Sequence, residues 1–248
     1  MRYRLDLAYH GRDFHGWQLQ PGLRTVQGEL ETWLGRLLRV GSPVAVTGAG
    51  RTDTGVHAAG MVAHFDTDVD VVPDELLERL RRALPPDLVV ISVVPVDPTF
   101  HARCNATGRR YSYRIATRPT PFGRDRHWLV TAPLERRLLD DAAAVIVGNR
   151  DFSGFCRAAS RKESSLCCVT ESSWQSEKEL LVYHVRADRF LHEMVRLLVG
   201  TMVDIARGRF GSERMSDVLT TGDVRLCGEA APPHGLTLEA VDYGMGRP

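Results

Sequence analysis

One short segment of the sequence concentrates residue types that could do nucleophilic or acid–base chemistry. Residues 48–58 read GAGRTDTGVHA, so Asp53 has basic, hydroxyl-bearing and glycine neighbours. An ionised carboxylate can act as a nucleophile or accept a proton, and a nearby guanidinium such as that of Arg51 favours its charged form. The glycines allow tight turns and let a ligand approach the backbone. An aspartate before Thr-Gly is also typical of an Asx turn, which is the structural alternative for Asp53.

The same segment and two others do not match the patterns of known cofactor and metal sites. A dinucleotide fingerprint would need glycine where Asp53 stands, and a P-loop would need lysine where Val56 stands. HEMVR at 192–196 has Arg196 where a zinc-binding helix needs its second histidine. The acidic run that begins at Asp66 lacks the glycine and glutamate of a calcium loop. These segments therefore indicate neither a phosphate-binding loop nor a metal site.

Two further residues are candidates because of the elements in which they are predicted to lie. Tyr111 alternates with other apolar residues in a predicted strand, a pattern typical of a core aromatic residue. Arg196 lies in an apolar stretch of a predicted helix, where a partly buried cation usually needs a carboxylate partner. That partner could belong to a functional site or to a structural ion pair. The candidates for a structural partner are Asp188 and Asp204.

Apolar periodicity predicts two successive units with the same order of elements. Strand, helix, strand, strand, helix and strand are indicated at 3–9, 26–38, 44–48, 61–66, from 73 and at 88–96. The same order is indicated at 109–116, 134–147, 167–175, 179–187, 190–207 and 236–243. We therefore predict an α+β protein of two tandem βαββαβ, ferredoxin-like domains, residues 1–104 and 105–248. Antiparallel sheets with helices on one face would create a cleft at the domain junction, where ligands usually bind.

The overall composition is that of a globular protein. Its 43% hydrophobic and 25% charged residues exclude the collagen-like, coiled-coil and disordered classes. No apolar run reaches the roughly 18 residues that cross a bilayer, and the first residues alternate in polarity instead of forming a secretory signal. Five cysteines predict reduced thiols rather than a disulfide framework. We therefore expect a cytoplasmic protein that does not associate with membranes.

Arginine dominates the basic residues. Lys162 and Lys178 are the only lysines among 32 basic residues, and 31 acidic residues leave a net charge of +1. Arginine suits bidentate phosphate contacts and stacking on bases. Residues 103–126 hold seven arginines and one aspartate, a local charge of +6. This distribution favours contact with nucleic acid, and a solvated arginine-rich face without a partner is the alternative.

An ordered series of segments resembles the tRNA pseudouridine synthase A family. The signature loop is GAGRTDTGVHA at 48–58, and the matching segments follow the family's order from residue 14 to residue 243. The others are FHGWQLQ at 14–20, TVQGELE at 25–31, FHAR at 100–103, RRYSYRI at 109–115, DFSGF at 151–155, FLHEMVRLLVG at 190–200 and APPHGLTLEAVDY at 231–243. The resemblance therefore spans nearly the whole chain.

This resemblance implies a fold, a reaction and a partner. The fold is α+β, with two such domains whose sheets join around a central basic cleft, and the assembly is a homodimer. The reaction is the isomerisation of uridine to pseudouridine, without a metal or cofactor. The implied partner is tRNA, and the implied targets are uridines at positions 38–40 in its anticodon arm.

The resemblance also assigns roles to four residues. Asp53 matches the catalytic aspartate, and Arg51 matches the arginine implicated in displacing the target base. Tyr111 matches the tyrosine that stacks on the uracil and is proposed to move the C5 proton. Arg196 matches the basic residue that pairs with the aspartate. The chain departs from the family pattern at other positions, among them Thr54, Glu193 and Leu197.

Two other functions are compatible with parts of the sequence. A non-catalytic RNA-binding module on the same scaffold would keep the arginine-rich surface without needing Asp53. A nucleotide-dependent enzyme that uses the glycine-rich loop would bind ATP or NAD saturably. The joint presence of Asp53, Tyr111 and Arg196 favours the isomerase, because RNA binding alone gives no reason for a carboxylate to face phosphates.

Overall fold

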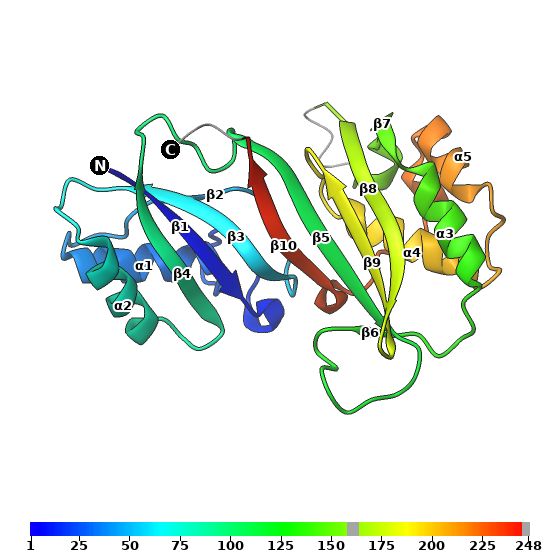
Figure 1. Ribbon diagram of the computed structural model, residues 1–248, viewed down its shortest axis with the longest axis horizontal. Helices are drawn as coiled ribbons and strands as arrows, with labels where there is room; N and C mark the ends of the chain where they lie inside the picture. The colour runs from blue at the N-terminus through cyan, green and yellow to red at the C-terminus, as the bar shows by residue number, and fades with distance from the viewer. Residues whose placement is uncertain (158–163, 245–248) are drawn as a thin grey trace. The chain divides into compact units, whose positions relative to one another are not determined.

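The computed structural model describes residues 1–157 and 164–244, which divide into two compact units (Figure 1). Unit 1 contains residues 1–107 and 237–244, and unit 2 contains Gly108–Leu236. Strands and helices occur in both units. The predicted α+β class is therefore confirmed.

The strands of unit 1 are arranged around β1. This strand, Arg2–Tyr9, lies between β3 (His57–Asp66) and β4 (Leu88–Val96) and is antiparallel to both. The short β2 (Val46–Gly48) also pairs with β3 in an antiparallel sense. The last strand, β10 (Leu236–Tyr243), pairs in parallel with the beginning of β3. The last strand therefore belongs to unit 1.

Alternation of polar and apolar residues explains why β1 has one buried face. Tyr3, Leu5, Leu7 and Tyr9 are all buried, whereas the residues between them are half-buried. Such a period of two places every second side chain on the same face of the sheet. The Tyr3 ring stacks on Phe65 of β3 at a centroid distance of 5.4 Å. This face is the core of unit 1.

Two helices cover that face. The first, α1 (Val26–Leu38), begins after Thr25, whose side-chain oxygen accepts a hydrogen bond from the Gly28 N–H as an N-cap. The second, α2 (Pro73–Ala83), has proline at its first position, where the missing N–H costs nothing. The two helices pack against each other, and α2 packs on β4 (Figure 1).

Unit 2 contains a second set of strands. Four of them pair successively in an antiparallel sense: β5 (Ala106–Ala116), β9 (Leu180–Ala187), β8 (Leu166–Glu177) and β7 (Gly148–Asp151). The two-residue β6 (Trp128–Leu129) is parallel to β5. The β6 strand thus pairs with the strand that precedes it in the chain.

The helices of unit 2 pack around α4 (Met194–Ala206). Eleven of its thirteen residues are buried, and the two others are Arg196 and Asp204. A helix that is apolar nearly all round must lie inside its domain. It contacts α3 (Arg136–Val145) and α5 (Arg214–Thr221). The short 3-10 helices are η1 (Gly11–Asp13), η2 (Ser153–Phe155), η4 (Val224–Leu226) and η5 (Pro233–Gly235).

The structure differs from the sequence-based expectations in several ways. The expected purely antiparallel pairing is wrong, because β10 pairs in parallel with β3 and β6 in parallel with β5. The last strand was predicted in a second domain of residues 105–248, yet it pairs within unit 1. The α5 helix and the short β6 and β7 strands were not predicted. Periodicity reports which face of an element is buried and not which strand lies beside it.

Candidate active site

Asp53 lies half-buried in the loop between β2 and β3 of unit 1. The Val56 N–H donates to the Asp53 carbonyl at 3.1 Å and closes a tight turn. The segment 14–17 forms hydrogen bonds with this turn. The Trp17 N–H donates to the Thr52 carbonyl at 3.1 Å, and the Gly55 N–H donates to the Phe14 carbonyl at 3.3 Å. The backbone that presents Asp53 is therefore fixed on both sides of the carboxylate.

Thr52, the residue before Asp53, points into the core of unit 1. Its side chain is buried, and its hydroxyl lies 2.8 Å from the hydroxyl of Tyr9 at the end of β1. A buried hydroxyl that keeps a hydrogen-bond partner avoids the cost of desolvation. The strand β1 therefore fixes the residue next to the candidate catalytic carboxylate.

His57 anchors the other end of the loop. Its ring is buried, and its Nδ1 atom accepts a hydrogen bond of 3.0 Å from the Gly11 N–H. A Cβ atom on Gly11 would lie 2.0 Å from the Val56 carbonyl oxygen, so this approach is possible only for glycine. Thr237 of β10 pairs with His57 and holds the start of β3. Three separate segments of unit 1 thus position the loop.

The segment that holds the loop is itself fixed by a charged cluster. The Arg24 guanidinium donates to both carboxylate oxygens of Asp87, at 2.7 and 2.8 Å, and to Glu29 at 3.0 Å. It also lies over the Phe14 ring at 4.1 Å. These hydrogen bonds hold the pKa of the Asp87 carboxyl below its usual range. Because the ions are partly buried, removal of one partner would leave an uncompensated charge in unit 1.

Tyr111 lies in β5 of unit 2, opposite Val185 of β9. Its ring is half-buried and meets the Phe190 ring edge to face, with centroids 5.1 Å apart. Tyr113, two residues on, is fully buried and donates to the Pro232 carbonyl at 2.8 Å. Burial raises the pKa of Tyr113 far above its usual value. Tyr113 is thus the core aromatic residue, whereas part of the Tyr111 ring is accessible.

Arg196 lies near the start of α4, and its side chain is 13% exposed. Its Nε donates to the Ala231 carbonyl at 2.8 Å, and its Nη1 lies 3.0 Å from a carboxylate oxygen of Glu193. Arg157 contacts the other oxygen of the same carboxylate. Glu193 caps the helix in the left-handed region with φ +59°. The guanidinium is therefore held by its own helix and by the segment before η5.

The structural partner predicted for Arg196 is wrong. Asp204 pairs instead with Arg209 at 3.0 Å. The Asp188 carboxylate accepts a hydrogen bond of 2.8 Å from the Cys168 N–H. Glu193 takes the partner's place because it stands three residues before Arg196, where side chains on a helix surface meet.

The predicted site residues are divided between the two units. Arg51 and Asp53 share the loop of unit 1, and Arg51 is exposed. Tyr111 and Arg196 belong to unit 2. The supporting contacts of Tyr9 and Gly11 were missed by the sequence analysis. The available signal was the segment at 14–20, which lies just after them and was recognised only as a family motif.

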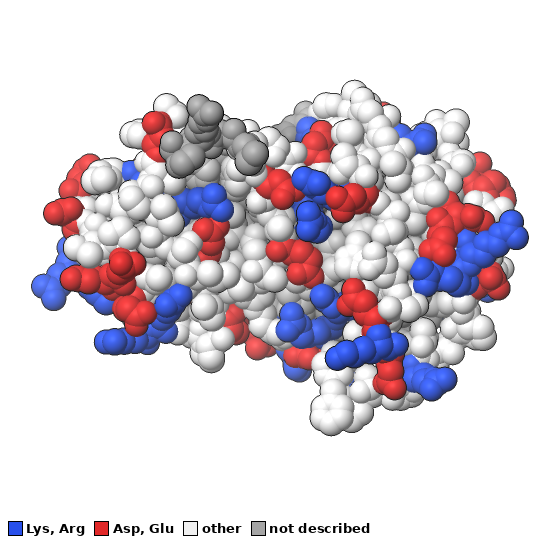
Figure 2. Space-filling model, in the orientation of Figure 1, with Lys and Arg blue, Asp and Glu red and all other residues white. Residues whose placement is uncertain are grey.

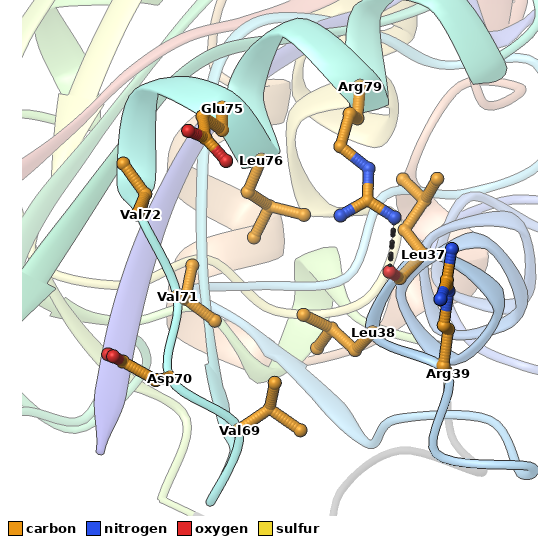
Figure 3. A pocket seen from close by; sticks show the side chains of 10 residues that line it. All are labelled: Leu37, Leu38, Arg39, Val69, Asp70, Val71, Val72, Glu75, Leu76 and Arg79. Atoms are coloured by element: carbon orange, nitrogen blue, oxygen red, sulfur yellow. Dashed lines mark hydrogen bonds between the residues drawn. The ribbon is translucent and has the colours of Figure 1, made fainter.

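Unit 1 also contains a cavity of about 400 Å³, and none of the predicted site residues lines it (Figure 3). It is bounded by the end of α1, the segment 69–72 and the first turns of α2. On its rim, Arg79 donates to the Leu37 carbonyl at 2.5 Å (Figure 3). Neither Arg51 nor Asp53 lines it. This cavity is therefore separate from the loop that carries the candidate chemistry.

The described residues contain neither a cluster of metal-ligating side chains nor a helix long and apolar enough to cross a membrane. Among residues 1–157 and 164–244, no three His, Cys, Asp or Glu side chains are grouped so as to hold a metal ion. The helices within these ranges are too short or too polar to span a membrane. Figure 2 shows basic and acidic side chains interspersed on the face that it draws. That mixture agrees with the net charge of +1.

Comparison with known proteins gives a consistent family. A family model described as tRNA pseudouridine synthase matches residues 142–244. The chain is 38% identical to tRNA pseudouridine synthase A of Parabacteroides distasonis, over 98% of this chain and 96% of the relative. It is 43% identical to the protein of the same name from Cutibacterium acnes, over 98% and 88% of the two chains. The resemblance of the ordered motifs is thus confirmed, and the chain belongs to the tRNA pseudouridine synthase A family.

Proposed function

We propose that this protein isomerises uridine to pseudouridine in tRNA, with Asp53 as the catalytic carboxylate. The observation that carries the proposal is the family membership along nearly the full chain, which includes the Asp53 loop. The contacts of Thr52 and His57 add physical support, because they hold that loop rigidly on both sides. A catalytic group must be held close to its productive geometry to be effective.

The reaction is an internal rearrangement, so it consumes no oxidant, reductant or second substrate. The bond between uracil N1 and ribose C1′ breaks, the base rotates, and a bond forms between C5 and C1′. C5 then loses its proton, and N1 gains one. The detached base must not escape during rotation, which requires an enclosed pocket. An ionised Asp53 could attack C1′ or accept a proton from the ribose.

The other three residues would handle the base and the charge. Tyr111, with its half-buried ring, would stack on the uracil and move the C5 proton. The exposed Arg51 would fill the space that the displaced base leaves in the RNA. Arg196 would pair with the Asp53 carboxylate and favour its ionised form. Extruding a base costs a few kcal/mol, and stacking together with a filling arginine offsets that cost.

The anticodon arm is the proposed substrate region, at positions 38–40. We further propose that the protein acts in the cytoplasm as a homodimer with a basic tRNA-binding cleft, and that it needs no cofactor. We also propose that the two halves of the chain are ferredoxin-like repeats, the second of which ends with β10. The order β5, α3, β8, β9, α4 and β10, which repeats the order of elements in the first half of the chain, supports this relation.

The decisive experiment is a tritium-release assay on tRNA labelled at uracil C5, without added metal or nucleotide. Wild type is expected to release tritium, and Asp53→Asn to release at least a thousandfold less, because the amide can neither attack nor accept a proton. The binding constant for tRNA should stay within about threefold of wild type. Thermal unfolding of both proteins checks that the variant is folded. Substantial release by Asp53→Asn would show that another residue carries the chemistry.

The non-catalytic RNA-binding module is the competing function, and the same assay separates it from the isomerase. It predicts tight tRNA binding with no tritium release from either protein. The nucleotide-dependent enzyme predicts thermal stabilisation by ATP or NAD. Either result would contradict the proposed isomerase.

A further inference from the structure

A long loop joins β5 to β6 (Figure 1), and it presents an aromatic side chain to solvent. Phe122 is 83% exposed, the largest exposed fraction among the large apolar side chains of the described chain. Isolated apolar residues on a surface are common, but a phenyl ring exposed to this extent leaves nearly all its apolar area in water. A ring held in this way is available to a partner.

The loop that carries Phe122 is ordered by its own contacts. Phe122 N–H donates to the Thr120 side-chain oxygen at 3.2 Å, and Arg126 N–H donates to the Gly123 carbonyl at 2.8 Å. Gly123 has φ +64°, a conformation that favours glycine and turns the chain directly after the ring. Prolines at 119 and 121 fix two further φ angles. The tip is therefore a preformed turn with a defined direction.

The base of the loop is anchored in unit 2. The Val130 N–H donates to the Ala116 carbonyl at 2.9 Å and closes the loop. The Trp128 ring packs edge to face on Tyr113, with centroids 6.4 Å apart. His127 is buried, and burial lowers its pKa. The aromatic tip thus projects from a rigid base, so a partner need not order a long flexible segment before it binds.

The charges around Phe122 indicate the chemistry of that partner. Arg118, Arg124 and Arg126 are exposed, and Asp125 is the only acidic residue between positions 117 and 127. Guanidinium groups suit phosphate oxygens, and an aromatic ring suits the flat face of a nucleic-acid base. Aromatic residues and arginine also occur in protein interfaces, but three guanidinium groups around one ring match the phosphates and base of RNA more closely than an apolar interface centre. Single-stranded RNA combines both complementary features.

We propose that the loop 117–127 is an RNA-contact surface on which Phe122 stacks against an unpaired base of the substrate tRNA. The neighbouring arginines contact the phosphates that flank this base. Bases within a duplex expose only their edges, so a projecting ring selects a base in a loop or at a helix end. This inference rests on the proposed function only in naming tRNA as the RNA.

The first test compares four substitutions of Phe122 by their binding constants for an unmodified tRNA transcript. Phe122→Ala and Phe122→Leu should each weaken binding about tenfold, because neither retains an aromatic face. Phe122→Tyr and Phe122→Trp should bind within about twofold of wild type. Leu166→Ala, at another exposed apolar residue of unit 2, is the matched control and should bind as wild type does. If Phe122→Leu binds tRNA as tightly as wild type, the ring does not stack on a base and the inference is overturned.

The dependence of tRNA binding on salt concentration distinguishes the contribution of the Phe122 ring from that of the arginines. Each phosphate contact contributes about −0.7 to −0.9 to the slope of log K against log salt. Phe122→Ala should leave this slope unchanged, whereas Arg124→Ala should make it shallower by about one contact. The Phe122→Trp variant adds a direct signal, because stacking on a base quenches indole fluorescence relative to the wild-type titration. An absence of additional quenching at saturating tRNA would overturn the inference.

Two controls separate this inference from the proposed isomerase. Binding is also measured in the Asp53→Asn background, which needs no turnover, so a failed isomerase would leave the Phe122 result interpretable. With active enzyme, Phe122→Ala should raise KM and leave kcat unchanged at saturating tRNA. Sedimentation of Phe122→Ala tests the other occupant, a second copy of this chain. A change in oligomeric state together with unchanged tRNA binding would overturn the RNA contact.

Discussion

At the scale of single residues, the Asp53 loop depends on side chains that do not take part in the chemistry. The Tyr9 and Thr52 hydroxyls lie 2.8 Å apart in the core of unit 1. Thr52 is bonded directly to Asp53, so a shift of Thr52 would also move the Asp53 backbone. Displacements of about 1 Å in a reacting group are enough to lower a rate strongly. We therefore regard Tyr9 and Thr52 as positioning residues for the proposed nucleophile or base.

Removal of this hydrogen bond should affect kcat more than substrate binding. Tyr9→Phe and Thr52→Val should each lower kcat about fivefold, with KM for tRNA within about twofold, because a net hydrogen bond is worth about 1 kcal/mol. Thr52→Ser keeps the hydroxyl and should restore most of the rate. The double variant should lose little beyond either single one. A lower Tm with kcat intact in Tyr9→Phe, Thr52→Val and the double variant would indicate a purely structural bond.

At the scale of elements, β3 connects the Asp53 loop to the FHAR segment at 100–103. His64, near the end of β3, is buried, and its Nδ1 accepts a hydrogen bond of 3.2 Å from the Ala102 N–H. The Tyr243 hydroxyl of β10 donates to the Ala102 carbonyl at 2.7 Å. Burial, the charge of Arg2 and the nearby His101 lower the pKa of His64. The folded state therefore favours the neutral ring.

Acid should destabilise the protein through this histidine. The unfolded chain protonates His64 near its ordinary pKa of about 6.5, whereas the folded chain does so only at lower pH. The stability that depends on neutral His64 is therefore fully present above about pH 6.5. It is lost as the pH falls toward and through the pKa of His64 in the folded protein. His64→Asn keeps an acceptor for the Ala102 N–H and should reduce the fall in Tm between pH 7.5 and 5.5. The matched control is the exposed His15→Asn.

His127 also has a lowered pKa, so part of the acid sensitivity should persist in His64→Asn. The measurement is the Tm of each protein at several pH values in one buffer series. An identical fall in wild type and His64→Asn would contradict the linkage. A reduced fall in His15→Asn would show that the effect is not specific to His64.

At the scale of the whole molecule, the net charge of +1 gives no general attraction to RNA. The local excess at 103–126 does, because phosphate contacts act within about 10 Å at ordinary salt. Arginine rather than lysine carries nearly all of this charge. Affinity for tRNA should therefore depend on a few local contacts and not on the net charge.

Increasing salt should weaken tRNA binding steeply. Log K should fall linearly with log salt, with a slope several times that of one phosphate contact. Glutamine replacements at Arg103, Arg118, Arg124 and Arg126, all exposed, should flatten the line in steps. The same number of replacements at Arg36, Arg39, Arg79 and Arg82 of unit 1 is the control. A flat line for wild type would exclude these phosphate contacts.

The sequence by itself determined most of the local elements and, through its ordered motifs, the family to which the chain belongs. Alternation in β1, the cap at Thr25 and the apolar run of α4 each report a preference that short stretches of chain express alone. The boundaries of β10 were predicted to the residue. The family motifs were also legible, because they consist of residue types at fixed spacings.

Only the tertiary structure decided which partners those elements and side chains take. In the folded chain β10 pairs with β3, Glu193 forms an ion pair with Arg196, and the hydroxyls of Tyr9 and Thr52 form a hydrogen bond. The tertiary structure also left the Phe122 ring in water, although its sequence neighbours Pro121 and Gly123 indicate only a turn. These outcomes join residues up to about 180 positions apart. A periodic pattern encodes which side of an element is buried, but contact between distant segments depends on how the whole chain packs.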